Sequence, residues 1–210
     1  MSADWTLIGG VALNRSTMDR SNVALSNWRD RDTGGALLGA DGGSSNNAAL
    51  YFQSEHDLRP GLMSYLGGRY DRFVTEGQVA QYTPPAFEQR YDRRSFGQFS
   101  PKLALVWEAQ SWLSLRASYG QGFRPPALLD LYGRTVVQLG PRTIVTEPSP
   151  ELVPERVRAF ELGADLAVEG GTRGSLSVYR QRLEDLIYRR TVASTPTVTV
   201  MIPGRQSVEA

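Results

Sequence analysis

The side chains that most often catalyse reactions or hold metal ions are scarce in this sequence. It has no cysteine and a single histidine, His56, so a thiol nucleophile, a thiolate metal site and a multi-histidine metal centre are excluded. His56 would need an oriented serine partner to act as a base, and no Gly-x-Ser-x-Gly elbow is present. Glu184 and Asp185 are adjacent, so in a strand they point to opposite faces and cannot form an acid–base pair. We therefore predict that the chain is not an enzyme.

One segment has the alternating carboxylates of a cation site. Asp30-Arg31-Asp32-Thr33-Gly34-Gly35 lacks the bidentate glutamate of a calcium loop, and we interpret it as a solvated loop. No Walker or Rossmann glycine pattern occurs either. The sequence therefore predicts neither a bound metal nor a cofactor.

Composition excludes further classes of protein. The 210 residues allow one domain, or at most two, and 23 Lys+Arg against 22 Asp+Glu give a formal net charge of +1. That balance gives no reason to expect a nucleic-acid partner. No apolar run is long enough for a transmembrane helix, and the first residues lack the apolar core of a signal peptide. A membrane barrel stays open, because its strands alternate lipid-facing and lumen-facing residues.

The elements that would position any site are β-strands. From Leu113 to Phe123 the odd positions are mainly apolar and the even positions polar, and similar alternation runs from Phe99 to Trp107 and from Arg158 to Val168. We expect an all-β antiparallel meander with strands near 4–14, 46–57, 62–74, 96–109, 112–124, 156–169 and 172–190, and a candidate eighth from about 197. One short helical turn is predicted at 127–132, after Pro125-Pro126.

The connections alternate between short and long. Tight turns are expected at 58–61, 108–112 and 169–172, and long polar stretches at about 15–46, 74–95 and 124–155. Outer-membrane barrels have short periplasmic turns and long extracellular loops, whereas long structureless loops are uncommon in compact soluble domains. Aromatic residues at or near the strand ends fit the girdles of such barrels: Trp5, Trp107, Trp112, Phe73, Tyr70 and Phe123.

Several segments together resemble the barrel of TonB-dependent outer-membrane receptors. They cover roughly residues 47–190 in a consistent order: Gly67-Gly68-Arg69-Tyr70-Asp71, the strand opening Phe99-Ser100-Pro101-Lys102-Leu103, the strand 112–124 with its continuation 126–132, Pro148-Ser149-Pro150-Glu151-Leu152-Val153-Pro154-Glu155-Arg156, Phe160-Glu161-Leu162-Gly163-Ala164-Asp165, and the hairpin arm 176–187. Pro125 and Val153 depart from the family pattern, and both lie in expected loops.

The resemblance implies a barrel of about 22 strands, of which seven or eight transmembrane strands would lie in this chain. We therefore expect residues 1–210 to be a partial barrel domain without the family's plug domain and energy-coupling box. The end, Val208-Glu209-Ala210, also lacks the terminal aromatic residue expected of an outer-membrane barrel. The alternatives are a complete small eight-stranded barrel with a structural or adhesive role, or an outer-membrane hydrolase. Pairing between the first and last strands would identify a closed barrel.

The resemblance also suggests where ligands would be bound. Polar residues expected to line the lumen are Arg69, Asp71, Lys102, Arg116, Glu161 and Asp165. Arginine forks bind carboxylates and phosphates, and aromatic rings stack on planar ligands. Candidate substrate-binding residues in the long loops are Trp28, Tyr82, Arg90, Tyr132, Arg134 and Arg142. Arg134 and Arg142 flank an apolar stretch, 136–139, that could form a loop hairpin.

The function implied by the resemblance is uptake of a scarce ligand across the outer membrane of a Gram-negative cell. Expected partners of the whole receptor are outer-membrane lipid, the plug domain and the rest of the barrel, the TonB complex through the missing N-terminal part, and an extracellular small ligand. A ferric siderophore is the family's commonest ligand and is the first expectation here. Vitamin B12, saccharides and other chelates are the alternatives.

Overall fold

The computed structural model of the protein describes residues 5–27, 29–168 and 170–209. Eight long strands dominate it: β1 (Trp5–Leu25), β2 (Gly34–Arg59), β3 (Leu62–Gln81), β4 (Phe87–Gln110), β5 (Leu113–Arg124), β8 (Glu155–Ala167), β9 (Arg173–Ser194) and β10 (Val198–Glu209). Four short elements complete it: η1 (Arg31–Thr33), α1 (Leu128–Tyr132), β6 (Thr135–Leu139) and β7 (Arg142–Thr146). Each of the eight expected strands is present, and so is the predicted helical turn.

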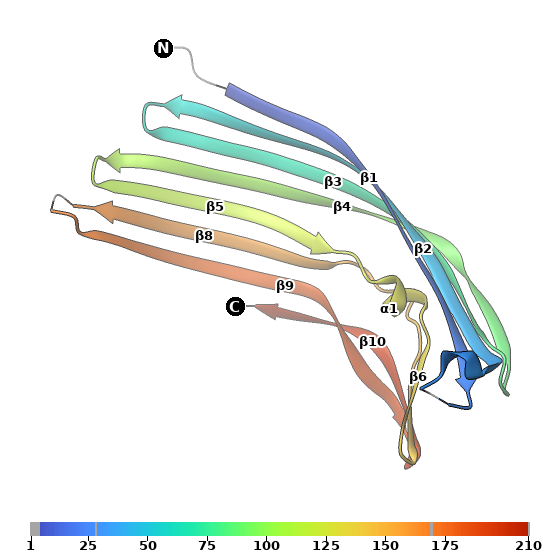
Figure 1. Cartoon of the computed structure of the whole chain (residues 1–210). Helices are drawn as coiled ribbons and strands as arrows, with labels where there is room; N and C mark the ends of the chain where they lie inside the picture. The colour runs from blue at the N-terminus through green and yellow to red at the C-terminus, as the bar shows by residue number, and fades with distance from the viewer. Residues whose placement is uncertain (1–4, 28, 169, 210) are drawn as a thin grey trace.

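The strands form one curved, mainly antiparallel sheet in the order β1-β2-β3-β4-β5-β8-β9-β10-β7-β6 (Figure 1). β7 joins the end of β10 in parallel, and β6 pairs with β7 as the hairpin predicted from residues 136–139. In the part of the chain that the structure describes, no backbone pairing joins β1 to β10. The sheet is therefore open, and the alternative of a closed eight-stranded barrel is not the arrangement observed.

Short turns lie at one end of the sheet, which we call the turn end. Residues 60–61 connect β2 to β3, and residues 111–112 connect β4 to β5. The turn between β8 and β9 is closed by a hydrogen bond of 2.9 Å from the amide of Val168 to the carbonyl of Thr172. Gly61 has φ +75°, a left-handed conformation that side chains disfavour, so glycine suits the tight turn.

At the other end, which we call the extended end, the prediction of long polar loops was wrong. Residues 15–25 and 34–46 continue β1 and β2, and residues 74–81 and 87–95 continue β3 and β4. Both faces of these ribbons are polar or rich in small residues, as in Asp41-Gly42-Gly43-Ser44-Ser45-Asn46-Asn47, so no period-two hydropathy marks them. Cross-strand pairing still satisfies their backbone groups, because it does not depend on apolar side chains.

Residues 125–154, which connect β5 to β8, are called the insert here. The insert contains α1, β6 and β7, and α1 contacts β1, β2 and β3 on the concave side of the sheet (Figure 1). A small core lies there, formed by Leu131, Tyr132 and Leu152 with partly buried neighbours such as Met18 and Tyr91. The third predicted loop is therefore a folded segment packed against the sheet.

Candidate functional site

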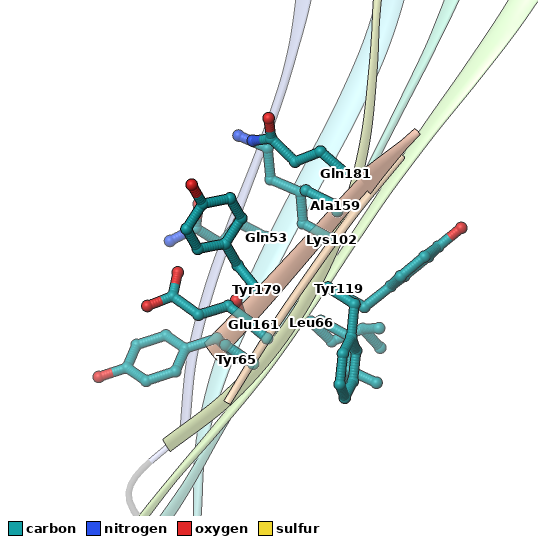
Figure 2. A pocket seen from close by; sticks show the side chains of 15 residues that line it. Gln53, Tyr65, Leu66, Lys102, Tyr119, Ala159, Glu161, Tyr179 and Gln181 are labelled. Carbon is teal, nitrogen blue, oxygen red and sulfur yellow. The ribbon is translucent and has the colours of Figure 1, made fainter. Parts of the chain in front are cut away.

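Near the turn end, the strand register separates an outer from an inner face. Residues directly opposite in a sheet share a face, and neighbours along a strand alternate. One row crosses four strands through Leu66, Leu103, Tyr119 and Phe160, all of them exposed. In Figure 2, Leu66 and Tyr119 point away from the side of the sheet that carries Tyr65 and Glu161. We call the side with the exposed apolar row the outer face.

Aromatic residues border the apolar band of the outer face at both ends. Trp5, Trp107 and Trp112 lie near the turn end, and Tyr70 and Phe99 lie on the far side of the band, all exposed. Phe99 and Trp107 are separated along β4 by eight residues, or about 27 Å at the usual rise of a strand. Strands of outer-membrane barrels are tilted by about 35–45°, so this length corresponds to a height of about 19–22 Å, somewhat less than the roughly 25 Å of their apolar band.

Two of the aromatic residues expected in the girdles lie elsewhere. Phe73 is only 6% exposed and stacks on Phe96, with ring centroids 5.1 Å apart. Phe123 meets Phe73 edge-on at 5.7 Å. Phe73 has the same strand parity as the inner-face Arg69 and Asp71, so this cluster packs on the inner side. Position near a strand end does not by itself say which face an aromatic residue takes.

The polar residues expected to line the lumen share the inner face. Arg69 donates two hydrogen bonds, of 2.7 and 2.8 Å, to the carboxylate of Asp71. Arg116 forms an ion pair with Asp165 and lies 3.9 Å from Glu161. Arg116 also donates to a hydroxyl on β9, the Oγ of Ser177, at 2.7 Å. Charged contacts therefore line this wall, within β3 for Arg69 and between β5, β8 and β9 for Arg116.

Midway along the sheet, Figure 2 shows the inner side of a region that carries short side chains with longer polar ones around them. The short side chains belong to two neighbouring rows of the register: Gly67, Gly120 and Ala159 in one row, and Ala104 and Ser118 in the other. The longer polar side chains around them are Gln53, Tyr65, Lys102, Glu161, Tyr179 and Gln181. An occupant could approach the backbone at the short side chains and form hydrogen bonds with the longer ones.

Tyr132 anchors the insert to the inner side of the extended strands. Its side chain is completely buried, and its hydroxyl donates a 2.9 Å hydrogen bond to Oγ1 of Thr75. The ring lies against Gly43 and Gly77, which face each other across β2 and β3. A Cβ on Gly43 or Gly77 would lie 2.7 or 2.3 Å from the nearest ring carbon. The two missing side chains create the space that the ring fills.

Arg20 ties the insert to the first hairpin. It donates two hydrogen bonds of 2.7 Å to the carboxylate of Asp41 and one of 2.8 Å to the backbone carbonyl of Arg134. The side chain of Arg134 donates to Glu147 at 3.0 Å and lies over the ring of Phe87 at 5.7 Å. The guanidinium of Arg134 is thus engaged within the protein in this conformation.

Two further arginines hold the ends of the insert. Arg94 lies 3.2 Å from Glu151 and donates a hydrogen bond to the backbone carbonyl of Pro150. Arg124 donates to both carboxylate oxygens of Glu155, at 2.5 and 2.8 Å. Glu155 also accepts a 2.8 Å hydrogen bond from the amide of Ile187. Charge-assisted, bidentate contacts of this kind fix orientation as well as position.

Burial changes the protonation of two groups on α1. The pKa of the Asp130 carboxyl is raised by burial, although Arg189 and Arg124 partly oppose the change. The pKa of the Tyr132 phenol is raised by burial too, so this hydroxyl remains a hydrogen-bond donor. Docking of α1 therefore disfavours a charged carboxylate at Asp130.

The structure places the predicted substrate-binding residues in different settings. Tyr132 and Arg134 belong to the contacts that hold the insert, so a ligand would reach the Tyr132 ring only after α1 moved. Arg142 lies at the far end of the β6–β7 hairpin, opposite Leu139 and about 17 Å along the strands from Arg134. The structure therefore does not bring these two arginines together.

The other candidates lie at hairpin tips. Tyr82 follows β3 and is 52% exposed, and Arg90 lies in β4, 3.6 Å from Glu88. Trp28 lies outside the described residues. Sequence reasoning did not foresee that Arg20, Asp41 and Arg94 contact other segments of the chain, because a contact between distant segments has no local signal. For the packing of Tyr132, the glycines at positions 43 and 77 were the available signal, since small residues often mark a close approach of another segment.

The described residues contain no group of three or more His, Cys, Asp or Glu side chains that could hold a metal ion. Asp30 caps η1 instead, accepting a 3.0 Å hydrogen bond from the amide of Asp32. The histidine, His56, lies near the turn end of β2, between Trp5 and Ser64 in the register. None of the helices in the described part has the length and hydropathy to cross a bilayer.

Comparisons with known proteins agree with this architecture. The family model for the β-barrel of TonB-dependent receptor-like proteins matches residues 2–208. No curated protein matches the chain closely enough to count as a relative. Among solved structures, the hemophore receptor HasR of Serratia marcescens, in complex with its hemophore HasA and heme, is similar with a TM-score of 0.63 and 19% identity.

Two further solved structures show weaker likeness. They are the ferric enterobactin receptor PfeA, with a TM-score of 0.49 and 11% identity, and the alcaligin outer-membrane receptor FauA of Bordetella pertussis, with 0.43 and 16%. The alignments cover 99%, 97% and 99% of this chain but only 38%, 38% and 36% of HasR, PfeA and FauA. The chain thus spans less than two fifths of the proteins it resembles.

Proposed function

The chain belongs to the family of TonB-dependent receptor-like β-barrels, and on that basis we propose that the whole protein takes up a scarce ligand through the outer membrane with energy from TonB. The observation that carries this proposal is the two-sided wall described above. Its outer face carries an apolar band between aromatic residues, and its inner face carries paired charges and short side chains with longer polar ones around them. The open sheet is consistent with a partial barrel domain whose remaining strands and plug lie elsewhere in the protein.

We propose a ferric siderophore as the first ligand to test. The extended hairpins β1–β2 and β3–β4 and the β6–β7 hairpin present arginine and aromatic side chains at their tips, which suits an anionic, partly planar chelate. Among these, Arg142 and Arg90 are exposed, so they can reach a ligand without the insert moving. Contacts by Trp28, Tyr82, Tyr132 and Arg134 remain part of the same proposal.

Haem is the comparison ligand, because the HasR structure holds heme together with a hemophore. Protein side chains that ligate haem iron are His, Cys, Met or Tyr. This chain has no cysteine, and its one histidine, His56, lies near the turn end, far along β2 from the hairpin tips. A histidine-ligated haem would need its histidine from another part of the protein, whereas the exposed Tyr82 could ligate haem from a hairpin tip, so the test includes haem beside the siderophores.

The test uses the full-length receptor in cells that lack their own siderophore receptors. We expect a radioiron-labelled siderophore from a defined panel to bind whether or not TonB is present, and to be taken up only when it is. Uptake that is unchanged without TonB would contradict the proposed energy source. Binding of haem with no binding of any siderophore would contradict the ligand assignment alone.

The arginines at the two ends of the hairpin provide the matching variants. For an anionic ligand, Arg134→Ala combined with Arg142→Ala should cost about 2–5 kcal/mol, or roughly 30-fold or more in affinity. Because Arg134 also holds Glu147, each single variant should be measured as well. Arg173→Ala, at the turn end, is the control. An unchanged dissociation constant in the double variant would refute the arginine contacts and leave the transport proposal standing.

A further inference from the structure

Arginines mark the border of the apolar band on the outer face. Following the outer-face positions toward the extended end, Leu13 is succeeded by Arg15 in β1, and Tyr70 by Arg72 in β3. In β8 the change occurs between Phe160 and Arg158, and in β9 between Val178 and Arg180. All four changes fall at the end of the band that is remote from the short turns. In the family orientation this is the extracellular border of the membrane.

In β8 and β9 three of these arginines gather. Arg158 lies directly opposite Arg182 in the register, and Arg180 lies opposite Phe160, two residues from Arg182 on the same face. Like charges directly opposite each other in a sheet destabilise the pairing. Such a pair needs negative charge beside it, from the protein or from a ligand.

The carboxylates nearby neutralise the cluster only in part. Glu184 lies 3.3 Å from Arg158 and 3.2 Å from Arg182, so two guanidinium groups share one carboxylate. Arg180 pairs with Glu209. Arg156 lies opposite Glu184 on the same face, so four cations against two anions leave an excess positive charge. Each guanidinium also has five N–H donors, of which these contacts use few.

The cluster is exposed and lies next to lipid-facing residues. The side chains of Arg158, Arg180 and Arg182 are 44%, 76% and 57% exposed. Phe160, the cross-strand neighbour of Arg180, is 46% exposed at the edge of the apolar band. Long arginine side chains can lay their apolar stems along such a band while the charged heads reach the headgroup layer. A ligand of this cluster therefore approaches from the membrane, not from the lumen.

We propose that Arg158, Arg180 and Arg182 form a site for the phosphate groups of a lipid headgroup in the outer leaflet. A guanidinium matches phosphate geometry with two parallel hydrogen bonds, and a phosphate between Arg158 and Arg182 would relieve their repulsion. The site lies on the outer face, whereas a transported ligand would meet the inner face and the hairpin tips. The inference therefore goes beyond the proposed uptake function and does not depend on which ligand is carried.

The test compares full-length receptor in phosphatidylcholine nanodiscs that contain either lipid A or its dephosphorylated form as a minor component. Native mass spectrometry would count the retained lipid, and we expect retention of the phosphorylated form only. Replacing all three arginines with glutamine should weaken retention about 100-fold, from about 5-fold for each arginine near a charged surface. Arg173→Gln makes the same change near the turn end of β9 and should leave retention unchanged.

A second variant should increase lipid retention, and an increase cannot be caused by loss of fold. Glu184→Gln leaves Arg158 and Arg182 without their shared carboxylate, so lipid retention should rise about 5-fold. Equal retention of both lipid forms by the unmodified receptor would overturn the proposal, as would full retention by the triple variant or a decrease in Glu184→Gln. Displacement of the lipid by inorganic phosphate at equal concentration would overturn the choice of a lipid as the occupant.

Discussion

Substituting Gly77 with alanine should release the insert from the sheet. The added Cβ would lie 2.3 Å from Cγ of Tyr132 and within 2.7 Å of both Cδ atoms, which is closer than such atoms approach in proteins. The Gly77 backbone is paired with Gly43 on one side and Tyr91 on the other, so it cannot easily retreat. The ring of Tyr132 must move, and α1 must move with it.

The size of the effect follows from what the ring loses. Removing a fully buried aromatic side chain costs about 3–5 kcal/mol, and displacing the ring forfeits much of this. A loss of about 3 kcal/mol raises the equilibrium constant for opening of the insert on the order of 100-fold. Tyr132→Phe loses only the 2.9 Å hydrogen bond to Thr75, about 1 kcal/mol, or roughly 5-fold.

Hydrogen exchange of the insert amides in the full-length receptor measures this opening directly. The matched control is Gly120→Ala in β5, where an added Cβ meets no heavy atom within 4 Å. That control should leave exchange in residues 125–154 unchanged.

The decisive comparison is a double-mutant cycle. With Tyr132→Ala already in place, the ring is gone, so Gly77→Ala should add less than about 0.5 kcal/mol. If Gly77→Ala accelerated exchange equally with and without the ring, its effect would come from the strand backbone, and the reasoning would be refuted.

Two other predictions concern the insert and the wall. Burial raises the pKa of Asp130, so docked α1 binds more protons than undocked α1 between the usual aspartate pKa and the raised one. Docking of α1 should therefore weaken as pH rises through that interval and stay strong below it. Asp130→Asn should abolish this pH dependence of amide exchange in the insert. A pH dependence that persisted in this variant would contradict the role of Asp130. Because the chain has no cysteine, spin labels can be attached at single sites. Labels at Leu103→Cys should be accessible to oxygen dissolved in lipid and labels at Lys102→Cys to a water-soluble nickel complex; the reverse pattern would show that the two faces are wrongly assigned.

The strands within the apolar band could be predicted because one of their faces is apolar. Leu113 to Phe123 alternates over its whole length, and β5 was found at Leu113–Arg124. β1 was expected to end near residue 14 and continues to Leu25, because hydropathy alternation stops where the band stops. Hydrogen bonding between strands needs no apolar face, so the part of a strand outside the membrane cannot be predicted from alternation of apolar and polar residues.

For the candidate site, the sequence predicted which polar residues share a face better than it predicted which contacts they make. The inner-face residues Arg69, Asp71 and Arg116 followed from strand parity together with the expected barrel. The burial of Tyr132 did not, because it depends on two glycines 55 and 89 residues away in the sequence. Such a long-range fit has no local signal, since each glycine read separately is compatible with an ordinary loop.

The length of the paired ribbons limits how the extracellular part of the protein can change. About twelve residues of β1 lie beyond the apolar band, a rise of about 40 Å, and they remain hydrogen-bonded to β2 almost to the tip. Deleting one residue from a paired strand turns every later side chain to the opposite face, whereas deleting two preserves the faces. Insertions and deletions here should therefore be tolerated in steps of two, and freely only at the unpaired tip. If related proteins differ in the length of these strands mainly by even numbers of residues, the difference would indicate that the sheet continues outside the membrane.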